Sequence, residues 1–315
     1  HHWANAAKEA FQQCILADLA KNGHLRDVAF IGGTALRILH RLPRYSEDMD
    51  FLWTGPSPTM DQIDGLKRTI SRGLSRMGVI PSISSSGIVA MGPCGEKEGF
   101  TIHLAISSPK FPSIARNGLQ ISFEFDLTPP AHHQPEARVF TLAHTQATIP
   151  SLDLPSLMAG KLHILLTRFD REKGRDWFDY LWYRRHGVEP NLRHLRSAIE
   201  QTVPAPGAPT AEYWMSAIRA RLPQVGWECV RRDVESFLEE RDDVGLITEA
   251  AIAEATPWPD FKALAELPRI PACVIADVRQ AAMEGVELAI DLREKLPPMP
   301  ELPTPPASSL RGRRP

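Results

Sequence analysis

Two aspartates separated by one residue, Asp48 and Asp50, are the side chains of this sequence best placed to do chemistry together. In a strand, successive side chains point to opposite faces, so Met49 and Phe51 would enter a core while both carboxylates project from the other face. Two carboxylates that close repel each other unless a cation lies between them. The spacing therefore predicts a site for a divalent metal such as Mg²⁺, whose other ligands are commonly phosphate oxygens and water.

A glycine pair precedes the two aspartates. Gly32 and Gly33 follow the segment 27–31, whose last four residues are apolar and which predicts a buried strand, and Thr34 opens a helix. Glycine can adopt backbone angles that expose N–H groups, and the N-terminus of a helix attracts phosphate. Thirteen residues separate Thr34 from Asp48. The combination predicts neighbouring elements that hold a nucleoside triphosphate on a divalent metal.

A second candidate motif lies on two helices. Apolar residues at helical spacing predict a helix over 154–169, and Lys161 and Arg168 lie seven positions apart, on one face of it. The next helix begins near Lys173 and carries Asp176 and Asp179 on one stripe. Taken alone, these charges fit a solvated helix face with surface ion pairs, which contribute little to stability.

The two motifs together resemble one family. The segments 32–37 and 44–51, and the later segments 161–168 and 173–182, are similar to the AbiEii/MenT toxins of toxin–antitoxin and abortive-infection systems. These belong to the nucleotidyltransferase superfamily with a polymerase-beta-like palm, and the resemblance covers about residues 5–190. It implies the catalytic residues Asp48, Asp50, Lys161 and Asp176, with Asp179 as a weaker candidate. It implies the nucleotide-binding residues Gly32, Gly33, Thr34, Arg44, Ser46, Lys161 and Arg175.

The superfamily also implies a third metal carboxylate on a later strand. Side chains of the segment 121–127 alternate, so that Ser122, Glu124 and Asp126 share the polar face. Glu124 is the preferred third ligand beside Asp48 and Asp50, and Asp126 is the alternative. Two further alternatives stay open. The metal site could consist of Asp48 and Asp50 alone, or the polar face of this strand could have no catalytic role.

The resemblance implies a Mg²⁺-dependent, or Mn²⁺-dependent, nucleotidyltransferase that takes a nucleoside triphosphate as substrate. The expected acceptor is RNA, most specifically the 3′ end of tRNA, where added nucleotides would block aminoacylation and translation. A cognate antitoxin is the expected protein partner. Transfer to a protein or small-molecule hydroxyl is one alternative. A non-catalytic nucleotide- or RNA-binding module regulated by an antitoxin is another.

Composition agrees with a globular enzyme. The chain has 315 residues, 43% of them apolar, and a formal net charge of −2, so charge gives no general argument for nucleic-acid binding. The four cysteines form no metal-binding pattern. With neither a signal peptide nor a run of eighteen apolar residues, we expect a cytoplasmic protein without a membrane segment. Basic residues gather around the second motif: Arg168, Arg171, Lys173, Arg175, Arg184 and Arg185.

The order of the elements predicts an α+β fold in which a mixed sheet flanked by helices precedes a helical lobe. We expect a nucleotidyltransferase domain with an N-terminal helix over 1–150, a helical domain over 151–294 and a proline-rich extended tail over 295–315. Further strands are expected at 79–90, 99–107, 119–127 and 137–141, with a turn at 93–99. Further helices are expected at 4–21, 58–77, 155–169, 174–186, 190–202, 209–222, 228–241 and 271–294, with a linker at 203–209.

Overall fold

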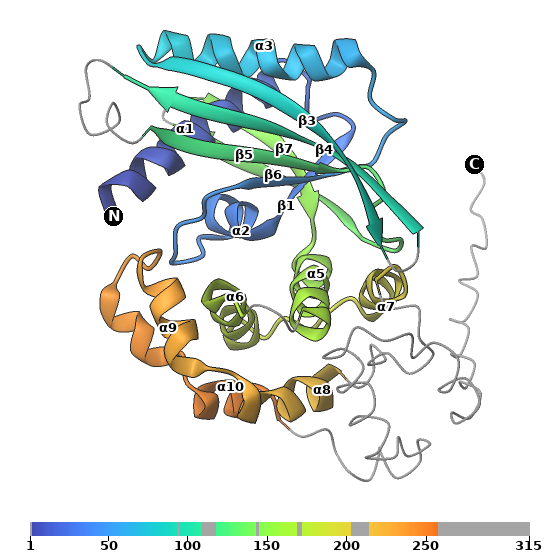
Figure 1. The fold of residues 1–315 in the computed structure, drawn as a ribbon, viewed down its shortest axis with the longest axis vertical. Coiled ribbons are helices and arrows are strands. Elements are labelled where there is room, and N and C mark those ends of the chain that lie inside the picture. Colours follow the sequence, from blue (N-terminus) through green and yellow to red (C-terminus); the bar gives the residue numbers. More distant parts are fainter. Residues whose placement is uncertain are drawn as a thin grey trace, which may run out of the picture.

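One mixed sheet organises the molecule. The computed structural model describes residues 2–92, 95–108, 118–142, 145–168, 172–202 and 214–257. Within them, seven strands lie in the order β3-β4-β5-β2-β1-β7-β6, with helices on both faces (Figure 1). The pairs β2–β5 and β1–β7 are parallel, and the other neighbours are antiparallel. The strands are β1 (Val28–Ile31), β2 (Met49–Trp53), β3 (Ile80–Gly92), β4 (Gly95–Ser107), β5 (Leu119–Asp126), β6 (Pro135–Leu142) and β7 (Thr145–Leu152).

The centre of the sheet brings the first motif together. Strand β1 leads directly into helix α2 (Gly32–His40), and the chain returns antiparallel as β2. Ile31 on β1 is the register partner of Asp50 on β2. Asp50 is in turn the partner of Glu124 on β5. Register partners lie side by side, so the strand pairing places Glu124 next to Asp50.

An aromatic stack fixes which face of the sheet these carboxylates occupy. Helices α1 (His2–Lys21) and α3 (Met60–Arg76) cover the first face (Figure 1). Beneath them, the ring of Phe125 stacks on Phe51 and on Phe100, with centroids 4.9 Å and 4.4 Å apart. All three rings are buried. Because side chains alternate along a strand, the stack turns Asp50 and Glu124 to the opposite face.

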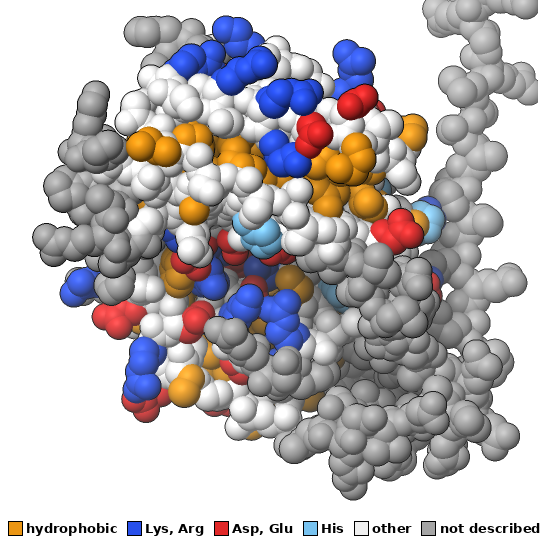
Figure 2. Space-filling model, turned by 45° about the horizontal axis from the view of Figure 1, so that its top comes forward, with side chains coloured by type: hydrophobic (Ala, Val, Ile, Leu, Met, Phe, Trp, Pro, Cys, Tyr) orange, Lys and Arg blue, Asp and Glu red, His pale blue; other side chains and the backbone are white. Residues whose placement is uncertain are grey.

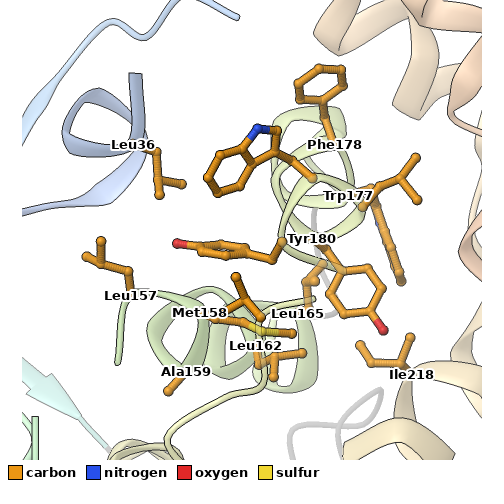
Figure 3. Close-up of a cluster of buried hydrophobic side chains, with 14 of the residues drawn as sticks. Leu36, Leu157, Met158, Ala159, Leu162, Leu165, Trp177, Phe178, Tyr180 and Ile218 are labelled. Carbon is orange, nitrogen blue, oxygen red and sulfur yellow. The ribbon is translucent and has the colours of Figure 1, made fainter. Parts of the chain in front are cut away.

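Helices from the second half of the chain pack on that opposite face. Their core includes the fully buried Trp177 and Tyr180 and extends to Leu36 on α2 (Figure 3). It also includes Ala29 of β1 and Leu52 of β2. The helices are α5 (Leu154–Thr167), α6 (Gly174–Arg185), α7 (Leu192–Glu200), α8 (Trp214–Arg221), α9 (Trp227–Glu235) and α10 (Glu249–Ala255), with 3₁₀ turns η2 (Leu222–Gln224) and η3 (Arg241–Leu246).

Strand β7 is a difference from the sequence-based expectation, which has no strand there. Pro150 argues against a strand because proline cannot donate to a ladder. Strand β7 pairs along β6, and its register with β1 falls at Ser151, directly after the proline. The Ser151 hydroxyl donates to the Phe30 carbonyl at 2.6 Å. Pro150 thus lies within the β6–β7 ladder, opposite Ala137, and the pairing with β1 falls at the next residue.

Two boundaries also differ from expectation. Thr59 caps α3 in a reciprocal capping box with Gln62, so the helix begins at Met60 and not at Pro58. The expected turn at 93–99 is shorter, because β3 and β4 pair as far as Gly92 and Gly95.

The α+β fold class is confirmed, with a mixed sheet first and helices after it. The helix expected at 228–241 ends earlier, at Glu235. The expected linker at 203–209, the helix at 271–294 and the tail at 295–315 lie outside the described residues. The domain boundary near residue 150 stays a prediction.

Candidate functional site

The glycine turn and the two aspartates meet in the structure. Gly32 has a φ of +76°, and a Cβ at this position would lie 2.1 Å from Oδ2 of Asp50. A Cβ on Gly33 would lie 2.6 Å from Nη2 of Arg44 and 2.9 Å from Oγ of Ser46. Glycine is thus required for the backbone to approach these side chains so closely.

The N-terminus of α2 therefore lies beside Asp50. The residue that precedes the helix, Ile31, provides no side-chain hydrogen bond to its first N–H groups. Uncapped N–H groups and the helix dipole attract anions such as phosphate. The buried Thr34 uses its hydroxyl to donate to the backbone carbonyl of Asp48, so it holds the loop before β2 against α2.

The third candidate carboxylate also lies at this position. Glu124 is exposed and is the register partner of Asp50. Asp126, the alternative, lies two register pairs further on, beside Leu52, and its carboxylate accepts from the backbone N–H and hydroxyl of Thr128. In the part of the chain that the structure describes, no three His, Cys, Asp or Glu side chains form a group that could by itself hold a metal ion.

Burial and like charges both oppose ionisation of Asp50. Burial is the largest cause that raises the pKa of Asp50, and together with the charges of Glu124 and Asp48 it brings that pKa to about 7. Lys161 and Lys173 act in the opposite direction. The effect of the two carboxylates on the pKa of Asp50 is thus larger than the opposing effect of the two lysines. An excess of negative charge of this kind favours binding of a cation.

Arg44 links the first motif to the second. The guanidinium donates to both carboxylate oxygens of Asp179 on α6, with Nε and Nη2 each at 2.6 Å. The side chains of this ion pair are 2% and 0% exposed. The third guanidinium nitrogen of Arg44, Nη1, donates to the carbonyl of Tyr45. Arg44, expected to bind nucleotide, therefore has its donors directed to the protein in this structure.

Lys161 joins the same cluster. Its ammonium lies 2.7 Å from Asp176 and 2.9 Å from Asp179, and Arg168 lies 3.7 Å from Asp176 at the rim. Burial alone would lower the pKa of Lys161, but the two carboxylates outweigh it and raise that pKa. Burial likewise opposes ionisation of Asp176, and the charge of Lys161 lowers its pKa overall. The two expected catalytic residues of the second motif are thus each other's partners.

Arg175 approaches the first motif through Glu47. Its guanidinium lies 3.1 Å from the Glu47 carboxylate and stacks over the ring of Phe237, 4.3 Å from the centroid. Lys8 of α1 binds the other oxygen of Glu47 at 3.1 Å. Gln12 of α1 donates to the carbonyls of Ser46 and Glu47. The loop that carries Asp48 is thus held from both faces of the sheet.

Three features of the site were missed or underrated in the sequence. Asp179 is the centre of the cluster, and its Asp-x-x-Asp spacing was the available signal. Glu47 bridges two basic residues, and its place between Ser46 and Asp48 was the only hint. Residues 237–239 pair with 43–45 through the Tyr45–Phe237 and Glu239–Pro43 backbone bonds. No local pattern predicts that long-range contact.

The space-filling view shows the result. In the hollow between the sheet and the helical half, acidic and basic side chains gather side by side (Figure 2). Such a mixture of charges suits a ligand that brings both phosphates and a metal, because carboxylates bind the cation and lysine or arginine bind the anion.

Comparison with known proteins shows the family of the chain. The model of the family "Nucleotidyl transferase AbiEii toxin, Type IV TA system" matches residues 14–266. The protein thus belongs to the AbiEii nucleotidyltransferase toxins of type IV toxin–antitoxin systems. Membership identifies it as a nucleotidyltransferase and implies a nucleoside triphosphate substrate and an antitoxin. No described helix is long and apolar enough to cross a membrane.

Two solved structures from Helicobacter pylori resemble the chain more distantly. JHP933 is 14% identical, with 89% of this chain and 95% of that chain covered and a TM-score of 0.43. A candidate nucleotidyltransferase is 15% identical, with 84% and 98% covered and a TM-score of 0.46. No curated protein matches the sequence.

Proposed function

We propose that this protein transfers a nucleotide from a nucleoside triphosphate to an RNA acceptor, the 3′ end of tRNA, in a Mg²⁺-dependent reaction. One observation carries the proposal. The Gly32 turn brings the uncapped N-terminus of α2 against Asp50, and the sheet register places Glu124 beside that carboxylate. Phosphate-binding N–H groups and metal-binding oxygens are thus adjacent.

The donor set fits Mg²⁺. Asp48, Asp50 and Glu124 offer oxygen atoms, which are the ligands that Mg²⁺ and Mn²⁺ prefer. Mg²⁺ sites commonly use one or two carboxylates together with substrate phosphates and water. A bound Mg²⁺ would neutralise the repulsion among these carboxylates and stabilise the charge of the phosphates during transfer.

The backbone and the side chains of the site have different roles in the reaction. The N-terminus of α2 binds the phosphates, and Asp48 and Asp50 would hold the Mg²⁺ that neutralises them and fixes their position relative to the acceptor. The acceptor hydroxyl oxygen forms a bond to the α-phosphorus as the bond from that phosphorus to its bridging oxygen breaks. The electron pair leaves with pyrophosphate, and the acceptor proton passes to Asp50 or to water. Positioning and charge stabilisation supply most of the rate enhancement.

An RNA acceptor suits the open side of the site. Glu124 is exposed, as are His103 and Ser86, which lie on the same sheet face along β4 and β3 and are hydrogen-bonded to each other at 3.1 Å. On the side of Glu124 away from Asp50, this sheet face therefore carries polar side chains that are exposed. A macromolecular 3′ end can approach there, whereas the Arg44–Asp179 pair is buried.

The test is a transfer assay on the purified protein with Mg²⁺, total tRNA and each α-labelled nucleoside triphosphate. Asp50→Asn is compared with Asp64→Asn, an exposed aspartate on α3 at the other face of the sheet. We expect label in tRNA, a loss of about a hundredfold or more in Asp50→Asn, and no change in Asp64→Asn. Oxidation of the tRNA 3′ diol with periodate should abolish labelling.

Other outcomes change the proposal in defined ways. Label on the protein or on a small molecule would keep nucleotidyl transfer and replace the acceptor. Nucleotide binding without any transfer would make the chain a non-catalytic module. Undiminished transfer by Asp50→Asn, with its folding verified, would contradict the assignment of this site.

A further inference from the structure

The second motif contains two lysines near Asp50, and one of them is already neutralised. Lys161 lies within 2.9 Å of two carboxylates, those of Asp176 and Asp179, and its side chain is 11% exposed. To bind a phosphate it would have to leave these partners, and Asp179 would then share its charge with Arg44 alone. Removing one member of a buried ion pair is costly. Lys161 is therefore a poor primary ligand for an incoming anion.

Lys173 is placed differently. It directly precedes α6 and is half-buried. No hydrogen bond or ion pair joins its ammonium to any residue that the structure describes. Its charge nevertheless acts on Asp50, as does that of Lys161. An unpaired ammonium with three donors, close to metal-binding carboxylates, is chemically suited to a phosphate group.

The backbone around Lys173 is held in place. The next residue, Gly174, packs against α9 so closely that a Cβ would lie 1.9 Å from the Val230 carbonyl oxygen. Its N–H donates to Asp233 at 2.8 Å. Two residues after Lys173, Arg175 contacts Glu47, the neighbour of Asp48. The start of α6 is thus fixed beside the metal-binding loop, with the Lys173 side chain left available.

We propose that Lys173 binds the β- and γ-phosphates of the incoming nucleotide, while Lys161 positions Asp176 and Asp179 and does not contact the triphosphate. The inference rests on the proposed function, because it concerns the substrate of that same site. In this arrangement Lys173 also holds the pyrophosphate that leaves, since the same oxygens carry the charge before and after transfer.

Equilibrium binding tests the inference without requiring turnover. With Mg²⁺ present, we would titrate pyrophosphate, an α,β-methylene nucleoside triphosphate and a nucleoside monophosphate. Lys173→Gln should weaken the first two ligands by about tenfold or more and leave the monophosphate unchanged. Its melting temperature should stay near that of the unmodified protein. Lys173→Arg should retain most of the affinity, and Lys67→Gln on α3 is the matched control.

Lys161→Gln separates the two roles. This variant leaves two buried carboxylates with one partner fewer, so its melting temperature should fall. Pyrophosphate binding of the protein that remains folded should stay within a few-fold of normal.

If Lys173→Gln binds pyrophosphate normally and Lys161→Gln does not, the assignment is reversed and the inference is wrong, while transfer to tRNA can still stand. If the unmodified protein binds no nucleotide and no pyrophosphate, the proposed function fails and the inference fails with it. If it binds them but transfers nothing, only the function fails.

Discussion

At the scale of residues, the most consequential side chain is Asp179, because it accepts from Arg44 and Lys161 while fully buried. Asp179→Asn keeps the volume but removes the charge that neutralises two buried cations. We expect a loss of about 3–5 kcal/mol in the free energy of unfolding, measured by urea denaturation. Normal stability of this variant would show that water or other groups already solvate Arg44.

The neighbouring Asp176 gives a matched comparison with a defined pH dependence. Asp176→Asn should cost less, because Lys161 keeps Asp179 as its partner. The folded pKa of Asp176 is lowered, so its contribution is fully present above its unfolded pKa of about 4 and is lost as the pH falls through the folded pKa. The stability difference between the unmodified protein and Asp176→Asn should therefore shrink only in acid.

At the scale of elements, two glycines in helices should respond in opposite ways to alanine. Gly32→Ala places a Cβ 2.1 Å from Oδ2 of Asp50 at a positive φ, so that carboxylate must move. A shift of about 1 Å in a catalytic group can lower the rate a hundredfold. Gly160→Ala in α5 meets open space and should stabilise the protein by about 1 kcal/mol. Transfer rates and melting temperatures of both variants check the pair. Full activity of Gly32→Ala would contradict the close approach.

The strands also differ in how far the sequence alone could predict them. Strand β5 was predictable because buried and polar residues alternate along it, and the shorter alternation over 48–51 set the face of Asp50 at the start of β2. Strand β7 was not, because Pro150 weakens its pattern and the bonding to β1 depends on tertiary context. Arg44 and Asp179 are 135 residues apart in the sequence. Local motifs therefore indicated each residue separately, but they could not predict that the two side chains contact each other.

At the scale of the whole molecule, two cores share the central strands. Ala29 of β1 packs with the helical half, whereas its neighbour Phe30 packs with α1 and α3. Leu238, fully buried, extends the helical core to the loop at Arg44 through a β-bridge. The two halves should therefore unfold as one cooperative unit despite the domain boundary expected near residue 150.

Leu238→Ala tests this coupling from the helical side. Burial predicts a loss of about 2–5 kcal/mol, and native-state hydrogen exchange can follow the slowest amides of β5 and α6 separately. If the molecule is one unit, both sets lose the same free energy, because global unfolding exposes them together. Loss of protection in α6 with unchanged protection in β5 would instead show two independent domains. In that case the contact between 43–45 and 237–239 would be a docking surface that forms after each half has folded, and the site could assemble or come apart without unfolding.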